Sequence, residues 1–139
     1  MGTQNNLNEY LKSVKNTPFK FGEHDCLTFT NSAYRAMYGT GWAEDLLGRY
    51  MSEKGVPLGR GALKETFGYQ TFESAVDDRL ITYKGVPPRG ALVTTTFCRK
   101  FVIGVAMGIS VGTSAVFLSG EGLISLPIEM IDKAWTHKP

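Results

Sequence analysis

Apolar residues in the first half of the chain recur every three or four positions, the spacing that buries one face of a helix. The first such series consists of Leu7, Tyr10, Leu11 and Val14. It predicts an N-terminal helix within residues 1–18, because Pro18 cannot continue a helix. The second series consists of Cys26, Phe29, Ala33, Ala36 and Met37. Asp25 stands at its N-cap and Gly39 at its C-cap, so we expect a second helix between them.

Shorter helices are expected around residues 42–47, 62–67 and 72–78. From residue 80 onward, β-branched and aromatic residues are separated by turns that contain glycine, which indicates strands. The expected strands are 80–83, 91–97, 101–107, 114–118 and 123–126. Pro127 ends the last of these strands, and residues 128–135 are expected as a short amphipathic helix or turn.

Helices followed by antiparallel strands predict an α+β fold, with the helices packed on one side of a sheet of about five strands. We expect a single domain over residues 1–139, because the length suits one domain and no linker divides the chain. Residues 136–139 are expected as a polar tail. Gly108 is expected at a turn or bulge, and residues 77–79 (Asp-Asp-Arg) in a solvated loop.

Composition narrows the classes of function. The net charge is +2 and the basic residues are scattered, so no nucleic-acid surface is expected. No apolar run reaches the roughly 18–20 residues that span a membrane, and the polar start lacks the apolar stretch of a signal peptide. Synthesis in a cytoplasm is therefore expected. Cys26 and Cys98 are expected as free thiols, and the two histidines lack zinc-site spacing, so we expect no metal and no cofactor.

One segment carries candidate chemistry. Phe21-Gly22-Glu23-His24-Asp25-Cys26 puts a cysteine at the first turn of the second expected helix. A helix N-terminus presents unpaired N–H groups and the positive end of the helix dipole, and both favour a nucleophilic thiolate. The alternative is a small buried side chain, the usual state of a free cysteine.

The Asp25-Cys26 pair behind an aromatic residue and a glycine resembles the active-site start of the NlpC-type cell-wall cysteine peptidases. Pro87-Pro88-Arg89-Gly90-Ala91-Leu92-Val93 resembles the strand entry of that family, and residues 101–108 resemble the strand that follows its histidine. The resemblance implies a papain-like fold. In that fold a helix carries the nucleophile, and an antiparallel sheet supplies a histidine and a third polar residue.

The order of motifs is similar to a compact branch of that superfamily, encoded by phages and prophages among tail genes. The shared motifs are Asp25-Cys26, Arg49-Tyr50, Gly61-Ala62-Leu63, Pro87-Pro88, Ile103-Gly104-Val105 and Ala134-Trp135. The resemblance covers residues 19–135. It implies a place in the virion tail, with other tail proteins as partners and peptidoglycan as a further one.

The chain departs from the family at the histidine. The resemblance places that residue directly before Ile103-Gly104-Val105, where this chain has Val102. The third polar position falls near Thr113 or Ser114. Cysteine catalysis needs a base within hydrogen-bond reach and a group that orients it, so two of three roles lack their usual residue.

Few other residues can replace the missing base. Arg99 and Lys100 stay charged at pH 7 and cannot act as an imidazole does. His24, two residues before Cys26, is the remaining candidate. His137 is expected in the disordered polar tail.

Three functions are compatible with these expectations. The first is a phage tail protein, at the tip or in assembly, built on an NlpC-like scaffold that is catalytically impaired, with Cys26 as a vestigial nucleophile. The alternative is an active cysteine peptidase or amidase that cleaves peptidoglycan peptides during phage entry, with Cys26 as nucleophile and His24 as base. The third is a small adaptor domain unrelated to peptidases.

Overall fold

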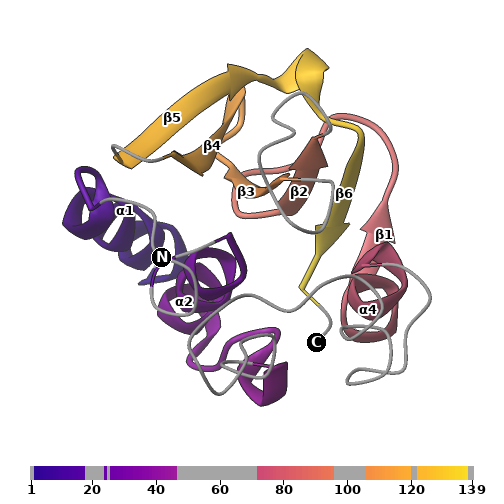
Figure 1. Cartoon of the computed structure of the whole chain (residues 1–139), viewed down its shortest axis with the longest axis horizontal. Coiled ribbons are helices and arrows are strands. Elements are labelled where there is room, and N and C mark those ends of the chain that lie inside the picture. Colours follow the sequence, from indigo (N-terminus) through magenta and orange to yellow (C-terminus); the bar gives the residue numbers. More distant parts are fainter. Residues whose placement is uncertain are drawn as a thin grey trace, which may run out of the picture.

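The helices lie mostly in the first half of the chain (Figure 1). The computed structural model describes residues 2–17, 24, 26–46, 72–95, 106–119 and 122–137. The α-helices in these residues are α1 (Gly2–Val14), α2 (Cys26–Tyr38) and α4 (Phe72–Arg79), and the 3-10 helices are η1 (Glu44–Leu46) and η2 (Ile128–Met130). Gly39 ends α2 with φ of 84°, and its N–H donates to the carbonyl of Arg35, as expected of a C-cap glycine.

The strands form one antiparallel sheet. They are β1 (Ile81–Tyr83), β2 (Leu92–Thr95), β3 (Ala106–Ser110), β4 (Ser114–Ser119), β5 (Gly122–Pro127) and β6 (Lys133–Thr136). Their order across the sheet is β1-β6-β2-β3-β4-β5. The expected α+β class is confirmed, with six strands in the described part of the chain.

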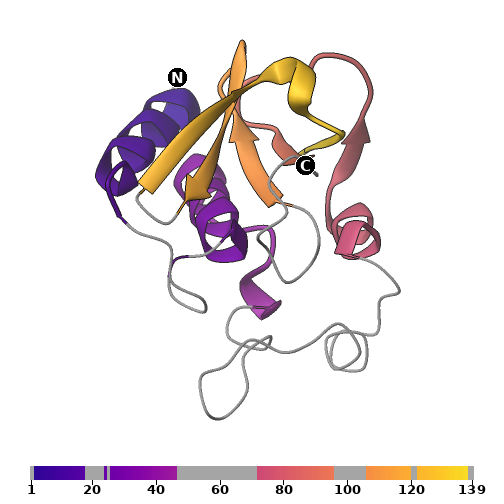
Figure 2. The same cartoon turned by 45° about the horizontal axis from the view of Figure 1, so that its top comes forward.

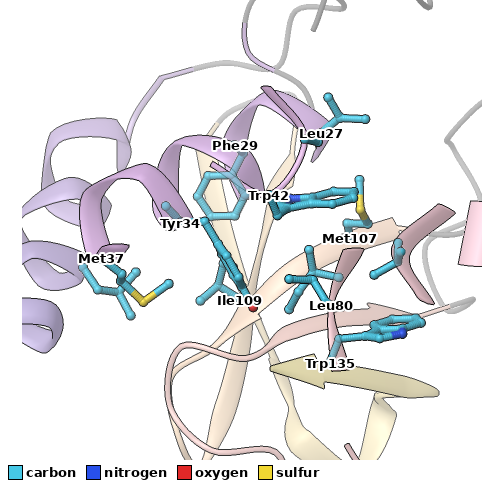
Figure 3. Close-up of a cluster of buried hydrophobic side chains, with 14 of the residues drawn as sticks. Leu27, Phe29, Tyr34, Met37, Trp42, Leu80, Met107, Ile109 and Trp135 are labelled. Atoms are coloured by element: carbon cyan, nitrogen blue, oxygen red, sulfur yellow. The ribbon is translucent and has the colours of Figure 1, made fainter. Parts of the chain in front are cut away.

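The helices contribute to a single core on one face of the sheet (Figure 2). This core joins residues of α1, α2 and α4 to alternate residues of the strands, and Figure 3 shows its centre. The strand residues in it are Leu92, Met107, Ile109, Leu118 and Trp135. A smaller cluster occupies the opposite face and consists of Val93, Ala115, Phe117 and Ala134, with Ile128 of η2 packed against it. Alternate residues of the strands therefore place buried apolar side chains on both faces of the sheet.

The two ends of the sheet can be told apart by the direction of the strands. β3 and β6 run the same way, because each pairs antiparallel with β2. We name the end where β3 begins the Ala106 end, and the end where β3 stops the Ser110 end. Because β6 runs with β3, its last residues also lie at the Ser110 end.

The sequence prediction was wrong at the C-terminus. Residues 128–135 were expected as a helix or turn, but they hold η2 and most of β6, which lies between β1 and β2. Residues 136–139 were expected as a polar tail. Thr136 instead pairs with Ile81 in the sheet, and His137 packs on an aromatic ring. Trp135 is the reason, because its side chain is buried in the core at 1% exposure.

The expectations for Gly108 and residues 77–79 were also wrong. Gly108 lies inside β3, opposite Phe117, where a Cβ atom would collide with the carbonyl of Val116 and the ring of Phe117. Asp77, Asp78 and Arg79 belong to α4, where Asp77 accepts a hydrogen bond from Nε1 of Trp135 at 2.7 Å. The expected helix at 62–67 and the motifs at residues 49–50, 61–63 and 103–105 lie outside the described residues.

Candidate active site at the start of α2

Cys26 is the first residue of α2, as the sequence predicted. The helix forms because its apolar residues fall on one face, and Phe29, Ala33 and Tyr34 are almost completely buried. That face packs along β3. The side chain of Cys26 and all of Asp25 lie outside the described residues, as does Cys98.

The Cys26 end of α2 lies at the Ala106 end of the sheet. His137 follows β6 at the Ser110 end, and its imidazole stacks on Tyr38, the last residue of α2, with ring centroids 3.8 Å apart. The opposite end of α2 therefore lies toward the beginning of β3. Figure 3 agrees, since Leu27 in the first turn of α2 lies on the side of Met107, near the start of β3.

His137 is consequently remote from Cys26. Cys26 and Tyr38 are twelve positions apart in the helix, which corresponds to roughly 18 Å along the axis. Tyr34 also contacts the imidazole edge-on, at 6.2 Å between centroids. The expected disordered tail is replaced by a histidine held between two tyrosines, and its place rules it out as a base for Cys26.

His24 lies beside the first turn of α2. Its ring meets that of Phe29 at 6.4 Å between centroids and an interplanar angle of 77°, and its Nε2 atom is buried. Phe29 is itself fully buried and stacks on Tyr10 of α1 at 6.0 Å. Cys26 and Phe29 are three residues apart and so share one face of the helix. His24 is therefore the histidine that the structure brings to the Cys26 side of α2.

The family resemblance assigns the other two roles to position 102 and to Thr113 or Ser114. Position 102 lies outside the described residues. Thr113 lies in the turn after β3 and Ser114 is the first residue of β4, so both lie at the Ser110 end. A five-residue strand is roughly 17 Å long, so these two residues are not brought to the Cys26 end of α2.

A pocket of about 330 Å³ lies at the Ser110 end, which sequence reasoning missed. Its lining includes Tyr34, Trp42, Arg79, Leu80 and His137. Burial raises the pKa of Tyr34, the charge of Tyr38 adds to that rise, and the backbone amide of Leu92 opposes it. Arg79 is held at this pocket by Asp45, whose carboxylate accepts bonds from both terminal guanidinium nitrogens.

Hydrogen bonds hold the loop after α2, which lines part of this pocket. The Nε1 atom of Trp42 donates to Oγ1 of Thr30 at 3.0 Å. Asn31, which is fully buried, accepts from the N–H of Ala43 at 2.7 Å and donates to Glu44 at 3.2 Å. No sequence pattern indicated the pocket, because its residues come from four separate segments and converge only in the fold.

The described residues contain no group of three or more His, Cys, Asp or Glu side chains that could hold a metal ion. Within the same residues, no helix is both long enough and apolar enough to cross a bilayer.

The chain matches the family described as Domain of unknown function (DUF6950) over residues 2–137. No curated protein matches it. The matched region takes in the three α-helices and six strands of the described residues. That description carries no chemistry, so the resemblance to NlpC-type peptidases stays a prediction. The chain belongs to the DUF6950 family.

Proposed function

We propose that this protein is a phage tail component built on an NlpC-like scaffold that no longer catalyses peptide cleavage. One observation carries the proposal. The helix that begins with Cys26 meets the end of the sheet where β3 begins, yet the residue four positions before β3 is Val102 rather than histidine. A valine cannot take a proton from a thiol, so the nucleophile lacks its usual base.

The arrangement of α2 on the sheet supports the scaffold part of the proposal. A papain-like fold places the nucleophile at the start of a helix that packs on an antiparallel sheet, and α2 packs in this way on β3. The place of His137 supports the loss of catalysis, because this second histidine stacks at the far end of α2. The tail setting rests on the motif order shared with phage-encoded relatives of the peptidases.

Catalysis is tested by incubating the purified protein with peptidoglycan sacculi and measuring newly freed amino groups. We expect no release above background from the wild-type protein or from Cys26→Ala, and the same thermal unfolding for both. Val102→His restores the residue of the peptidase pattern, and cleavage gained by this variant and lost again in Val102→His/Cys26→Ala would support the scaffold. Cleavage by the wild-type protein that Cys26→Ala abolishes would overturn the proposal.

The tail setting has a separate test. Virions purified from the source strain should contain this chain among their tail proteins when analysed by mass spectrometry. Its absence from intact virions that carry complete tails would contradict the tail assignment, whatever the outcome of the cleavage assay.

The alternative, an active cysteine peptidase, is favoured by the position of His24 next to the first turn of α2. It predicts fast alkylation of Cys26 by iodoacetamide at neutral pH, slowed in His24→Gln, with Cys98→Ala as background so that only Cys26 reacts. Alkylation no faster than that of a free thiol with a pKa of about 8.5 would count against this alternative.

A further inference from the structure

The outer side of β1 is a strand edge without a partner strand among the described residues. β1 is the first strand in the order of the sheet, and none of the described residues pairs with its outer side. Ile81 is 45% exposed, Tyr83 is 39% exposed, and Val86 in the following turn is 70% exposed. Exposed apolar side chains along an unpaired strand are a template for pairing with another strand.

The main-chain groups that this edge offers follow from the alternation of an antiparallel ladder. The N–H of Ser110 donates to the carbonyl of Ala91 at 2.9 Å, so Ala91 bonds toward β3. The main-chain N–H and C=O of its neighbour Leu92 must then bond to β6, where Leu92 lies opposite Trp135. Because Trp135 bonds to β2, the main-chain groups of the residues before and after it point the other way and bond to β1.

Those residues, Ala134 and Thr136, lie opposite Tyr83 and Ile81. Ile81 and Tyr83 therefore use their main-chain groups within the sheet. By the same alternation, the N–H and C=O of Thr82 point away from the sheet. Within β1, the main-chain groups that face outward are therefore the N–H and the C=O of Thr82.

We propose that β1 pairs antiparallel with β1 of a second copy of this chain, about a two-fold axis at Thr82. The pairing is self-complementary, because each Thr82 N–H would donate to the Thr82 carbonyl of the other copy. It sets Ile81 opposite Tyr83 of the second copy on each side of the axis, in the non-hydrogen-bonded positions where side chains approach most closely.

The directions in which the side chains of β1 point also fit this register. The hydroxyl of Thr82 bonds to Asp77 of α4 at 3.2 Å, so Thr82 faces the helices. Ile81 and Tyr83 therefore point to the other face of the sheet, where the two apolar pairs would lie side by side. An aromatic residue against a β-branched residue is a favourable cross-strand pair.

Charge also favours a second copy as the occupant. The register puts Lys84 of the second copy opposite Leu80, the residue that directly follows α4. The C-terminal end of a helix carries unpaired carbonyls and a partial negative charge, which attract an ammonium group. Arg79 in the last turn of α4 is engaged by Asp45, which limits its repulsion of that lysine.

The contact is small. Three paired residues and their neighbours bury far less than the roughly 1,200 Å² of a standard stable interface, so the dimer should be weak and should exchange rapidly. Sedimentation velocity over a concentration series should show a mass that rises from one copy toward two. A mass that remains at one copy up to the highest soluble concentration would overturn the proposal.

Charge variants test the register. Ile81→Lys/Tyr83→Lys should abolish association, because lysines of the two copies would face each other. Ile81→Lys/Tyr83→Glu should restore it, because each lysine then faces a glutamate. Ile124→Lys on β5, at 38% exposure and on the opposite edge strand, is the matched control and should associate as the wild type does. Association that survives the double-lysine change would refute this interface.

Hydrogen exchange gives a readout that does not depend on substitution. The amide of Thr82 should exchange more slowly as protein concentration rises, whereas the amides of Ile81 and Tyr83, already bonded to β6, should not change. Protection of Thr82 that is independent of concentration would contradict the proposed pairing.

Discussion

Asn31 is a fully buried amide that joins α2 to the loop after it. Its side-chain oxygen accepts the N–H of Ala43, and its nitrogen donates to Glu44. A buried N–H that loses its acceptor keeps the cost of desolvation. We expect Asn31→Ala to lower the free energy of unfolding by about 2 kcal/mol, measured by chemical denaturation.

Asn6→Ala is the control for this change. Asn6 is exposed on α1, where a substitution should shift the free energy of unfolding by no more than about 0.5 kcal/mol. Equal effects of the two substitutions would show that the Asn31 contacts contribute little.

Glu44 gives the loop a pH dependence. Hydrogen bonds from Arg35 lower its pKa from 4.5 to about 2, and the bonds from the N–H of Gly41 and from Asn31 act in the same direction. A carboxyl whose pKa falls on folding adds stability above its unfolded pKa and loses that stability as the pH falls. The contribution of Glu44 is therefore complete above pH 4.5 and disappears toward pH 2.

The test compares unfolding of the wild type and Glu44→Gln from neutral pH down to about pH 2. The wild type should be the more stable protein above pH 4.5, and its advantage should shrink steadily below that value. In an Arg35→Gln background the same comparison should depend less on pH, because the main cause of the shift is gone. An advantage that stays constant down to pH 2 would contradict the role of Arg35.

At the scale of elements, Gly108 allows β3 to pack against β4. A Cβ atom there would collide with the carbonyl of Val116 and the ring of Phe117. Overfilling a packed site costs about 1–3 kcal/mol, so we expect Gly108→Ala to lower the free energy of unfolding by about 2 kcal/mol.

Gly39→Ala is the control for this change, because it introduces backbone strain without a collision. Gly39 has φ of 84° and no atom within 4 Å of its added Cβ, so its substitution should cost about 1 kcal/mol through strain alone. The prediction for Gly108 is wrong if chemical denaturation shows that it costs no more than Gly39→Ala.

Local patterns predicted most elements, because the elements concerned have strong local signals. α2 has an apolar face and a C-cap glycine, and β2 lies within a run of β-branched residues. β6 has only four residues, and its partners β1 and β2 lie about 40–50 residues earlier in the chain, where no periodicity can reveal them.

The candidate site also has one feature that nearby residues predict and one that depends on distant parts of the chain. The place of Cys26 at a helix start depends on nearby residues and could be predicted. The position of His137 depends on β6 being a strand and on a tyrosine 99 positions earlier, so the sequence alone could not supply it.

At the scale of the whole molecule, the last strand completes the fold. β1 joins the sheet through β6 alone among the described strands, and Trp135 of β6 donates to Asp77 of α4. A chain that ends at Asp132 would therefore lose both the neighbour of β1 and the largest fully buried side chain, that of Trp135. We expect it to lose its cooperative thermal transition, followed by near-ultraviolet circular dichroism. A chain that ends at His137 keeps β6 and the stack on Tyr38, and it should unfold as cooperatively as the full chain. A sharp transition in the chain that ends at Asp132 would show that α4 and β1 dock without β6.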